Sequence, residues 1–145
     1  MTLLIAGVLI WTLVHVFKRV MPEMRASIDA KIGAGPAKGI ITLIFLASIA
    51  MMVFGFMAVG EQAVYEPPSW GAVVNNLLMV VAVFMMGAGS SKGIAPTLLR
   101  HPMLMGVVVW SFGHLLANGD TRSLVLFGGL GIWAVLNMLV INMRE

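Results

Sequence analysis

Residues 40–59 read IITLIFLASIAMMVFGFMAV, an uninterrupted apolar stretch without a charged side chain. A helix needs about 20 apolar residues to cross a hydrocarbon core roughly 30 Å thick, so this stretch is long enough to span a bilayer. Apolar residues follow one another here instead of alternating with polar ones, which favours a transmembrane helix over a strand of a membrane barrel. The stretch therefore indicates an integral membrane protein.

Four more apolar segments continue this pattern, at residues 2–17, 72–89, 103–117 and 124–141. Of the 145 residues, 60% are hydrophobic and only 10% are charged, whereas a soluble domain carries about 25% charged residues. Too few polar side chains remain to form a water-facing surface. The first and fourth segments are short, and we expect them to extend through flanking residues whose polar ends reach the membrane interface.

The sequence thus predicts an all-α fold, a polytopic membrane helical bundle that forms a single domain over residues 1–145. Its five transmembrane helices are expected at about residues 2–19, 39–60, 71–89, 102–117 and 123–142. The fourth helix begins at Pro102 or, with a kink, at Pro96, because proline fits the first position of a helix. Its Gly106, Gly113 and Ala117 form a stripe of small side chains that favours close contact with another helix.

The charged residues give these helices a direction. With five spans, eight of the nine basic residues fall on one side of the membrane: Lys18, Arg19, Arg25, Lys31, Lys38, Lys92, Arg100 and Arg144. The other side carries Arg122 together with Glu61, Glu66 and Asp120. Basic loops face the cytoplasm, so we predict an outside N-terminus and an inside C-terminus. A four-span arrangement would spoil this partition. The basic residues lie beside the lipid bilayer, and we predict no nucleic-acid partner.

Two polar segments carry strong turn signals. In the first loop, the acidic residues Glu23 and Asp29 and the bases around them suit a short helix on the membrane surface. We expect Gly33, Gly35 and Pro36 to break that helix before the second span. Further along, residues 118–120 read NGD, and the glycine is suited to the left-handed conformation that ends many helices.

Histidine is the residue type most suited to chemistry within these spans. Of the three histidines, His15 and His114 lie inside apolar segments, where an ionisable side chain is costly and points to a function. Each follows a tryptophan by four residues, Trp11 and Trp110, which places each pair on one helix face. Without any cysteine, imidazole is the strongest available ligand for a metal or for haem iron. The alternative is that each histidine hydrogen-bonds across helices and only stabilises packing.

The expected depths of the histidines complicate a shared ligand set. At 1.5 Å per residue, His114 lies roughly 20 Å along its helix from His101, whereas His15 lies about 6 Å from Arg19. If His101 and Arg19 mark the same interface, His15 and His114 lie at different depths. His101 is therefore an alternative ligand that matches His15 better. It could equally cap the fourth helix or contact lipid phosphate together with Arg100.

Other classes of function find less support. The 13 methionines could bind Cu(I) through their thioethers, but flexible filling of apolar space is the usual role of methionine. No carboxylate falls inside a predicted span, which argues against a proton-driven transporter. The sequence contains no nucleophile–base pair and no phosphate-binding loop, so no catalytic residue is assigned.

Several motifs of the second half of the chain resemble those of one family. Residues 100–104 read RHPML, Trp110 precedes HLLANGD at residues 114–120, and residues 126–129 read LFGG before Ile132-Trp133-Ala134. The first half adds His15 followed by a basic residue and the segment PPSW at residues 67–70. Together these motifs are highly specific, and they resemble the NnrU family over nearly the whole chain.

The resemblance implies a haem protein of the bacterial inner membrane. The family is named for bacterial proteins linked to nitrite and nitric oxide reduction, and a plant relative looks like a haem-b-dependent isomerase of a cis-carotene. In that relative the histidines that match His15 and His114 are the candidate axial ligands. Haem b, redox or isomerisation chemistry, and respiratory or denitrification enzymes as partners are therefore expected. The alternative is a non-catalytic membrane component that assists assembly or regulation of such enzymes.

The same resemblance suggests roles for residues near the two histidines. Trp11 and Trp110 would pack the haem pocket, and Arg19 or Arg100 would neutralise the propionates. At Lys18 the chain departs from the family, because many members have arginine three residues after the first histidine. Arg19 could take that role instead.

Overall fold

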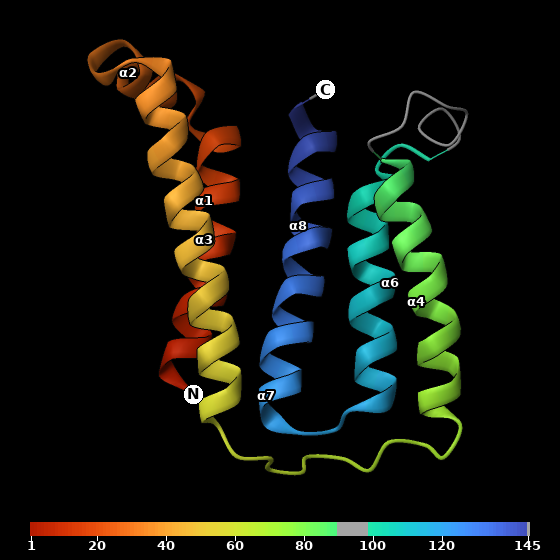
Figure 1. Cartoon of the computed structure of the whole chain (residues 1–145). Coiled ribbons are helices and arrows are strands. Elements are labelled where there is room, and N and C mark those ends of the chain that lie inside the picture. The colour runs from red at the N-terminus through yellow and green to blue at the C-terminus, as the bar shows by residue number, and fades with distance from the viewer. Residues whose placement is uncertain (90–98, 145) are drawn as a thin grey trace. The chain divides into compact units, whose positions relative to one another are not determined.

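The computed structural model describes residues 1–89 and 99–144, and the segments it describes are mainly helical (Figure 1). Their contacts divide the chain into two compact units, Met1–Val59 and Gly60–Glu145. Unit 1 contains α1 (Thr2–Val20), α2 (Pro22–Ile32) and α3 (Ala34–Ala58). Unit 2 contains α4 (Gly71–Ala88), α6 (Pro102–Ala117), α7 (Thr121–Ser123), a π-helical turn η1 (Leu124–Gly128) and α8 (Gly129–Arg144). The prediction of a single domain over residues 1–145 stays a prediction.

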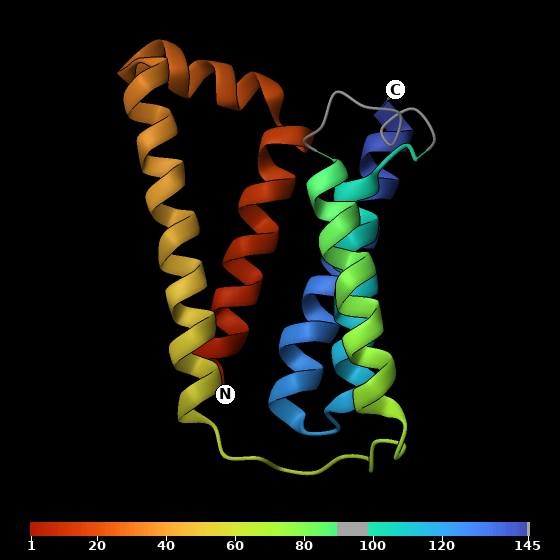
Figure 2. The ribbon, with the colours of Figure 1, turned by 45° about the vertical axis from the view of Figure 1, so that its right-hand side comes forward.

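In unit 1, α1 and α3 pack side by side in opposite directions (Figure 2). Glycines let their backbones approach closely, as is usual between membrane helices. A Cβ atom on Gly7 would lie 2.9 Å from the Ser48 carbonyl oxygen, and one on Gly55 would lie 2.7 Å from the Cα atom of Leu4. Leu4 itself is fully buried. Small residues therefore hold this helix pair together.

The short helix predicted for the first loop is present as α2. The chain bends at Met21, Pro22 occupies the start of α2, and α2 lies at 90° to Thr2–Phe17 of α1. The predicted break over three residues was wrong, because only Gly33 interrupts the helices, with a φ of 89°. Gly35 and Pro36 lie in the first turn of α3. Backbone N–H groups of a first turn have no acceptor within the helix, so the N–H that proline lacks costs no hydrogen bond there. As a result α3 begins at Ala34.

Unit 2 is built around the antiparallel pair α4 and α6, with α8 packed on α6 (Figure 1). The predicted small-residue contact is confirmed at two positions of α6. A Cβ atom on Gly106 would lie 2.9 Å from the Ala82 carbonyl oxygen, and one on Gly113 would lie 2.9 Å from Oδ1 of Asn75. The helix begins at Pro102; the alternative start at Pro96 lies outside the described residues.

By length and composition, the described helices give three to four candidate membrane spans. Three pass on their own, namely Ala34–Ala58, Gly71–Ala88 and Thr121–Met143, and a fourth counts if Thr2–Phe17 and the bent α2 form one span. With 16 residues, α6 is only about 24 Å long, less than a hydrocarbon core. Many large apolar side chains on these helices are exposed, including Phe84 at 71%. An all-helical membrane protein is thus supported, while five spans and the orientation stay predictions.

Candidate functional site

His15 lies in an aromatic cluster that joins α1 to α3. Its ring centroid is 4.4 Å from that of Trp11, one turn earlier on α1, and 4.3 Å from that of Phe45 on α3. Trp11 and Phe45 also touch, with centroids 5.4 Å apart. We call these three residues the α1 cluster. All three are partly buried, so the imidazole is held between two apolar rings.

A backbone hydrogen bond determines which ring nitrogen of His15 can act as a ligand. Nδ1 lies 2.9 Å from the carbonyl oxygen of Trp11. A carbonyl oxygen can only accept, so Nδ1 carries the hydrogen, and the lone pair of the neutral ring is then on Nε2. Histidines that bind metals commonly donate their other N–H to a backbone carbonyl, which fixes both tautomer and ring orientation. Nε2 is therefore the ring nitrogen of His15 that can accept a bond.

His114 lies in a second cluster of the same composition, within unit 2. Its ring stacks on Phe127 with centroids 4.2 Å apart and an interplanar angle of 4°. Trp110, one turn earlier on α6, meets the edge of His114 at 5.1 Å and that of Phe127 at 4.9 Å. We call Trp110, His114 and Phe127 the α6 cluster. Each cluster thus combines a tryptophan and histidine four residues apart with a phenylalanine from a neighbouring helical segment.

The π-helical turn η1 supplies Phe127 to the α6 cluster. Such turns insert an extra residue into a helix and are frequent at functional sites. The hydroxyl of Ser111 on α6 donates to the carbonyl oxygen of Phe127. A Cβ atom on Gly131 would lie 2.5 Å from this hydroxyl, so a glycine is needed for the close approach. Ser111 and Gly131 therefore fix the turn that places Phe127 on His114.

The phenylalanines were missed by the sequence analysis. Phe127 stands within the LFGG motif, which was a usable signal, although the glycine that allows the close helix contact is Gly131, just after the motif. Nothing in the local sequence marks Phe45 as different from the other apolar residues of α3. Trp11 and Trp110 were predicted to share a helix face with the histidines, and each does contact its own histidine. Their role in packing a haem pocket stays a prediction.

The remaining candidate residues lie outside the clusters. Nε2 of His101 lies 2.9 Å from Oδ1 of Asn142, so this side chain joins the start of α6 to the end of α8. His101 occupies the N-cap position of α6, as one of the alternatives held, although its side chain makes no capping hydrogen bond. Arg19 and Arg100 are exposed at the ends of their segments. Since His15 and His114 belong to different units, their pairing stays a prediction.

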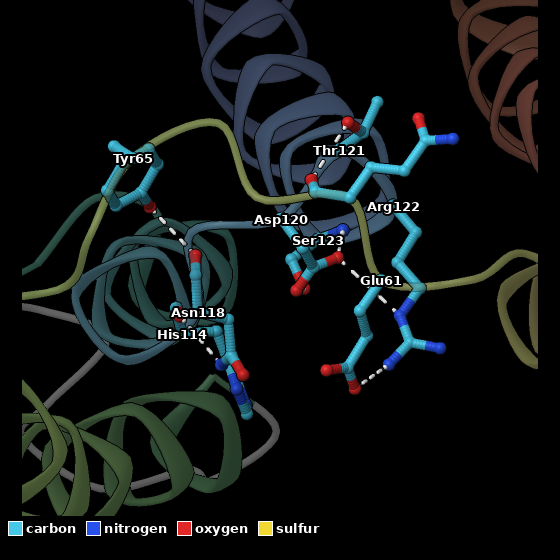
Figure 3. Close-up of polar contacts among 9 residues, drawn as sticks. Glu61, Tyr65, His114, Asn118, Asp120, Thr121, Arg122 and Ser123 are labelled. Atoms are coloured by element: carbon cyan, nitrogen blue, oxygen red, sulfur yellow. Dashed lines mark hydrogen bonds and ion pairs between the residues drawn. The ribbon is translucent and has the colours of Figure 1, made fainter.

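At the other end of α6, the loop before α4 closes on the NGD turn. We call residues 61–65 of this loop together with residues 118–120 of the turn the loop clamp (Figure 3). The Tyr65 hydroxyl contacts the carbonyl oxygens of Leu115 and Asn118, and the backbone N–H groups of Val64 and Tyr65 donate to the carbonyl of Gly119. Gly119 does not have the predicted left-handed conformation, since its φ is not positive. Glycine is needed there because a Cβ atom would collide with the carbonyl oxygen of Tyr65.

Charged groups tie the clamp to the start of α7. The Asp120 carboxylate accepts from the backbone N–H of Ser123 at 2.9 Å and from its hydroxyl at 2.8 Å. Arg122 pairs with Glu61 at 2.5 Å and approaches Asp120 at 3.5 Å. Burial raises the pKa of Asp120, but the Ser123 hydrogen bonds and the charge of Arg122 outweigh it, so the pKa lies below its ordinary value. The carboxylate is thus ionised at neutral pH and caps α7.

The lowered pKa of Asp120 predicts a loss of stability in acid. Its stabilising contribution is complete above the unfolded pKa of about 3.9 and is lost as the pH falls through the lower folded pKa. We expect the Tm of the wild type to exceed that of Asp120→Asn near neutral pH, with the gap closing as the pH falls below the unfolded pKa of about 3.9. Asparagine also caps helices well, so the comparison isolates the charge. Thermal unfolding in detergent measures it; a gap that stays constant with pH would contradict the assignment.

Metal ligation by clustered side chains receives no support from the described ranges 1–89 and 99–144, where no three histidine, aspartate or glutamate residues gather.

Comparison with known proteins gives one family. A family model described as NnrU protein matches residues 3–145. The match covers both aromatic clusters and the loop clamp. No curated protein and no solved structure matches the chain.

Proposed function

Because the chain belongs to the NnrU protein family, we propose that it binds b-type haem in the membrane, with His15 and His114 as the residues that would hold the iron. It would cross the bacterial inner membrane five times, with its C-terminus in the cytoplasm. Bound haem would supply an iron centre for redox or isomerisation chemistry. By its family, the protein would act together with the respiratory enzymes that reduce nitrite and nitric oxide.

The observation that carries this proposal is the hydrogen bond from Nδ1 of His15 to the Trp11 carbonyl. It leaves Nε2 as the basic nitrogen, as a histidine that would hold iron requires. The ring contacts of His15 in the α1 cluster are with aromatic side chains.

The α6 cluster supports the same chemistry for His114. Its ring lies flat against Phe127 and against the edge of Trp110. Among the residues that the structure describes, its ring nitrogens make no hydrogen bond. An ionisable ring inside a span is costly to keep without a partner, and ligation of an iron would offset that cost. Arg19 or Arg100 would neutralise the propionates at the cytoplasmic ends of their helices.

The proposal is tested by purifying the protein in a mild detergent from cells supplied with haem precursor. We expect the pyridine haemochrome spectrum of haem b at one haem per chain. Circular dichroism on the same sample shows whether the chain is helical. A helical but colourless protein would reject haem binding and favour the alternative, a non-catalytic component whose histidines pack helices. Two haems per chain would reject the shared ligation.

A further inference from the structure

Unit 1 contains an apolar groove that the haem proposal does not use. Its volume is about 350 Å³, and its walls come from all three helices of the unit. They include Leu13 and Phe17 of α1, Ile28 and Ile32 of α2, and Ile40 of α3. His15 is not among the lining residues. The groove is therefore a separate feature from the α1 cluster.

The bend between α1 and α2 creates this groove. Because α2 lies at 90° to the first part of α1, it crosses above the space between α1 and α3 instead of filling it (Figure 2). No residue of α2 is fully buried. Ile32 and Ile40 remain 45% and 50% exposed. Such apolar walls favour a hydrocarbon occupant over water.

Positive charges flank one end of the groove. Lys31 lies three residues after the lining residue Ile28 on α2, and Lys38 lies three residues before the lining residue Ile41 on α3, so each lysine neighbours the helix face that lines the groove. Both lysines are exposed, and neither forms an ion pair within the described part of the chain. Arg25 differs, because Asp29 holds it at 3.0 Å. The two lysines are thus available to an anion whose apolar part lies in the groove.

We propose that this groove binds an anionic phospholipid, with an acyl chain between α1, α2 and α3 and the phosphate beside Lys31 and Lys38. The arrangement separates apolar walls from basic side chains as an amphiphile with a charged head requires. Basic residues at a cytoplasmic membrane surface attract anionic lipids in this way. A neutral apolar molecule would not use the lysines. A second copy of this chain would bring its own basic residues against them.

Native mass spectrometry of the full chain tests the proposal with two lipids of equal chain length, phosphatidylglycerol and phosphatidylcholine. We expect the wild type to retain phosphatidylglycerol preferentially. Each of Lys31→Gln and Lys38→Gln is expected to weaken that retention roughly fivefold, and the double variant more. Because both lysines are exposed, these variants should fold normally, which the unfolding temperature without added lipid checks.

Substitutions in α3 separate the groove from the general lipid shell. Ile40→Trp fills the groove and is expected to abolish specific retention of either lipid. Leu43→Trp is the matched control, since Leu43 is 67% exposed but does not line the groove, and it should behave as wild type. Equal retention of both lipids by the wild type would overturn the proposal. Unchanged retention in the double lysine variant, or equal losses in Ile40→Trp and Leu43→Trp, would also overturn it.

Discussion

Replacing His15 or His114 with alanine is expected to lower the haem content of the purified protein at least about tenfold. Loss of hydrogen-bonding partners around a metal ligand already costs 10- to 100-fold in affinity, and loss of the ligand itself should cost no less. Each substitution also removes the centre of an aromatic cluster, the α1 cluster for His15 and the α6 cluster for His114. The Soret absorbance relative to protein concentration measures the effect.

His101→Ala is the control, because this histidine is the alternative ligand. Its Nε2 lies 2.9 Å from Asn142, so we expect the variant to keep its haem and to lose only some stability. Added imidazole should restore a low-spin spectrum to His15→Ala and His114→Ala, since it can occupy the vacated position. Wild-type haem content in either of these variants, or loss of haem in His101→Ala with both others retaining it, would contradict the assignment.

Replacing Gly55 with alanine is expected to destabilise unit 1 more than ordinary overpacking does. Overpacking usually costs about 1–3 kcal/mol where the neighbouring side chains can move. The new Cβ atom would lie 2.5 Å from the backbone nitrogen of Leu4 and 2.7 Å from its Cα atom. Backbone cannot move aside as a side chain does, so α1 and α3 must separate. That movement would also pull His15 away from Phe45.

Gly39 offers a matched control on the same helix. A Cβ atom there would meet nothing within 4 Å, so Gly39→Ala should be neutral or stabilise α3 by up to about 1 kcal/mol, because alanine is the better helix former. Unfolding in detergent, followed by helical circular dichroism, compares the two variants. Equal stability of Gly55→Ala and Gly39→Ala would show that α1 and α3 do not pack as described.

Hydropathy located the helices well because lipid imposes a simple requirement on the sequence. A helix in hydrocarbon must satisfy its backbone internally and be apolar outside, and both conditions are local. The start of α3 was misplaced because Gly35 and Pro36 act as helix breakers only in a helix interior, and here they lie in its first turn. The short α6 shows the limit of the method, since length and composition alone do not make it a span.

The candidate site was only half predictable. Tryptophan and histidine four residues apart on one helix share a face by geometry, so Trp11–His15 and Trp110–His114 could be found from spacing. Phe45 and Phe127 reach the histidines through tertiary packing, and for Phe127 through a π-helical turn that no hydropathy pattern signals. The prediction of a left-handed conformation for Gly119 was wrong for a related reason. The NGD motif predicts a turn, but the need for glycine comes from Tyr65, more than 50 positions earlier in the chain.

Near-infrared magnetic circular dichroism of the oxidised, haem-loaded protein tests the central claim most directly, because its charge-transfer band identifies the axial ligands of ferric haem. We expect the band of low-spin iron with two histidine ligands in the wild type, and its loss in both His15→Ala and His114→Ala. A band typical of histidine–methionine ligation, or a high-spin spectrum in the wild type, would contradict the assignment of His15 and His114 as the ligand pair.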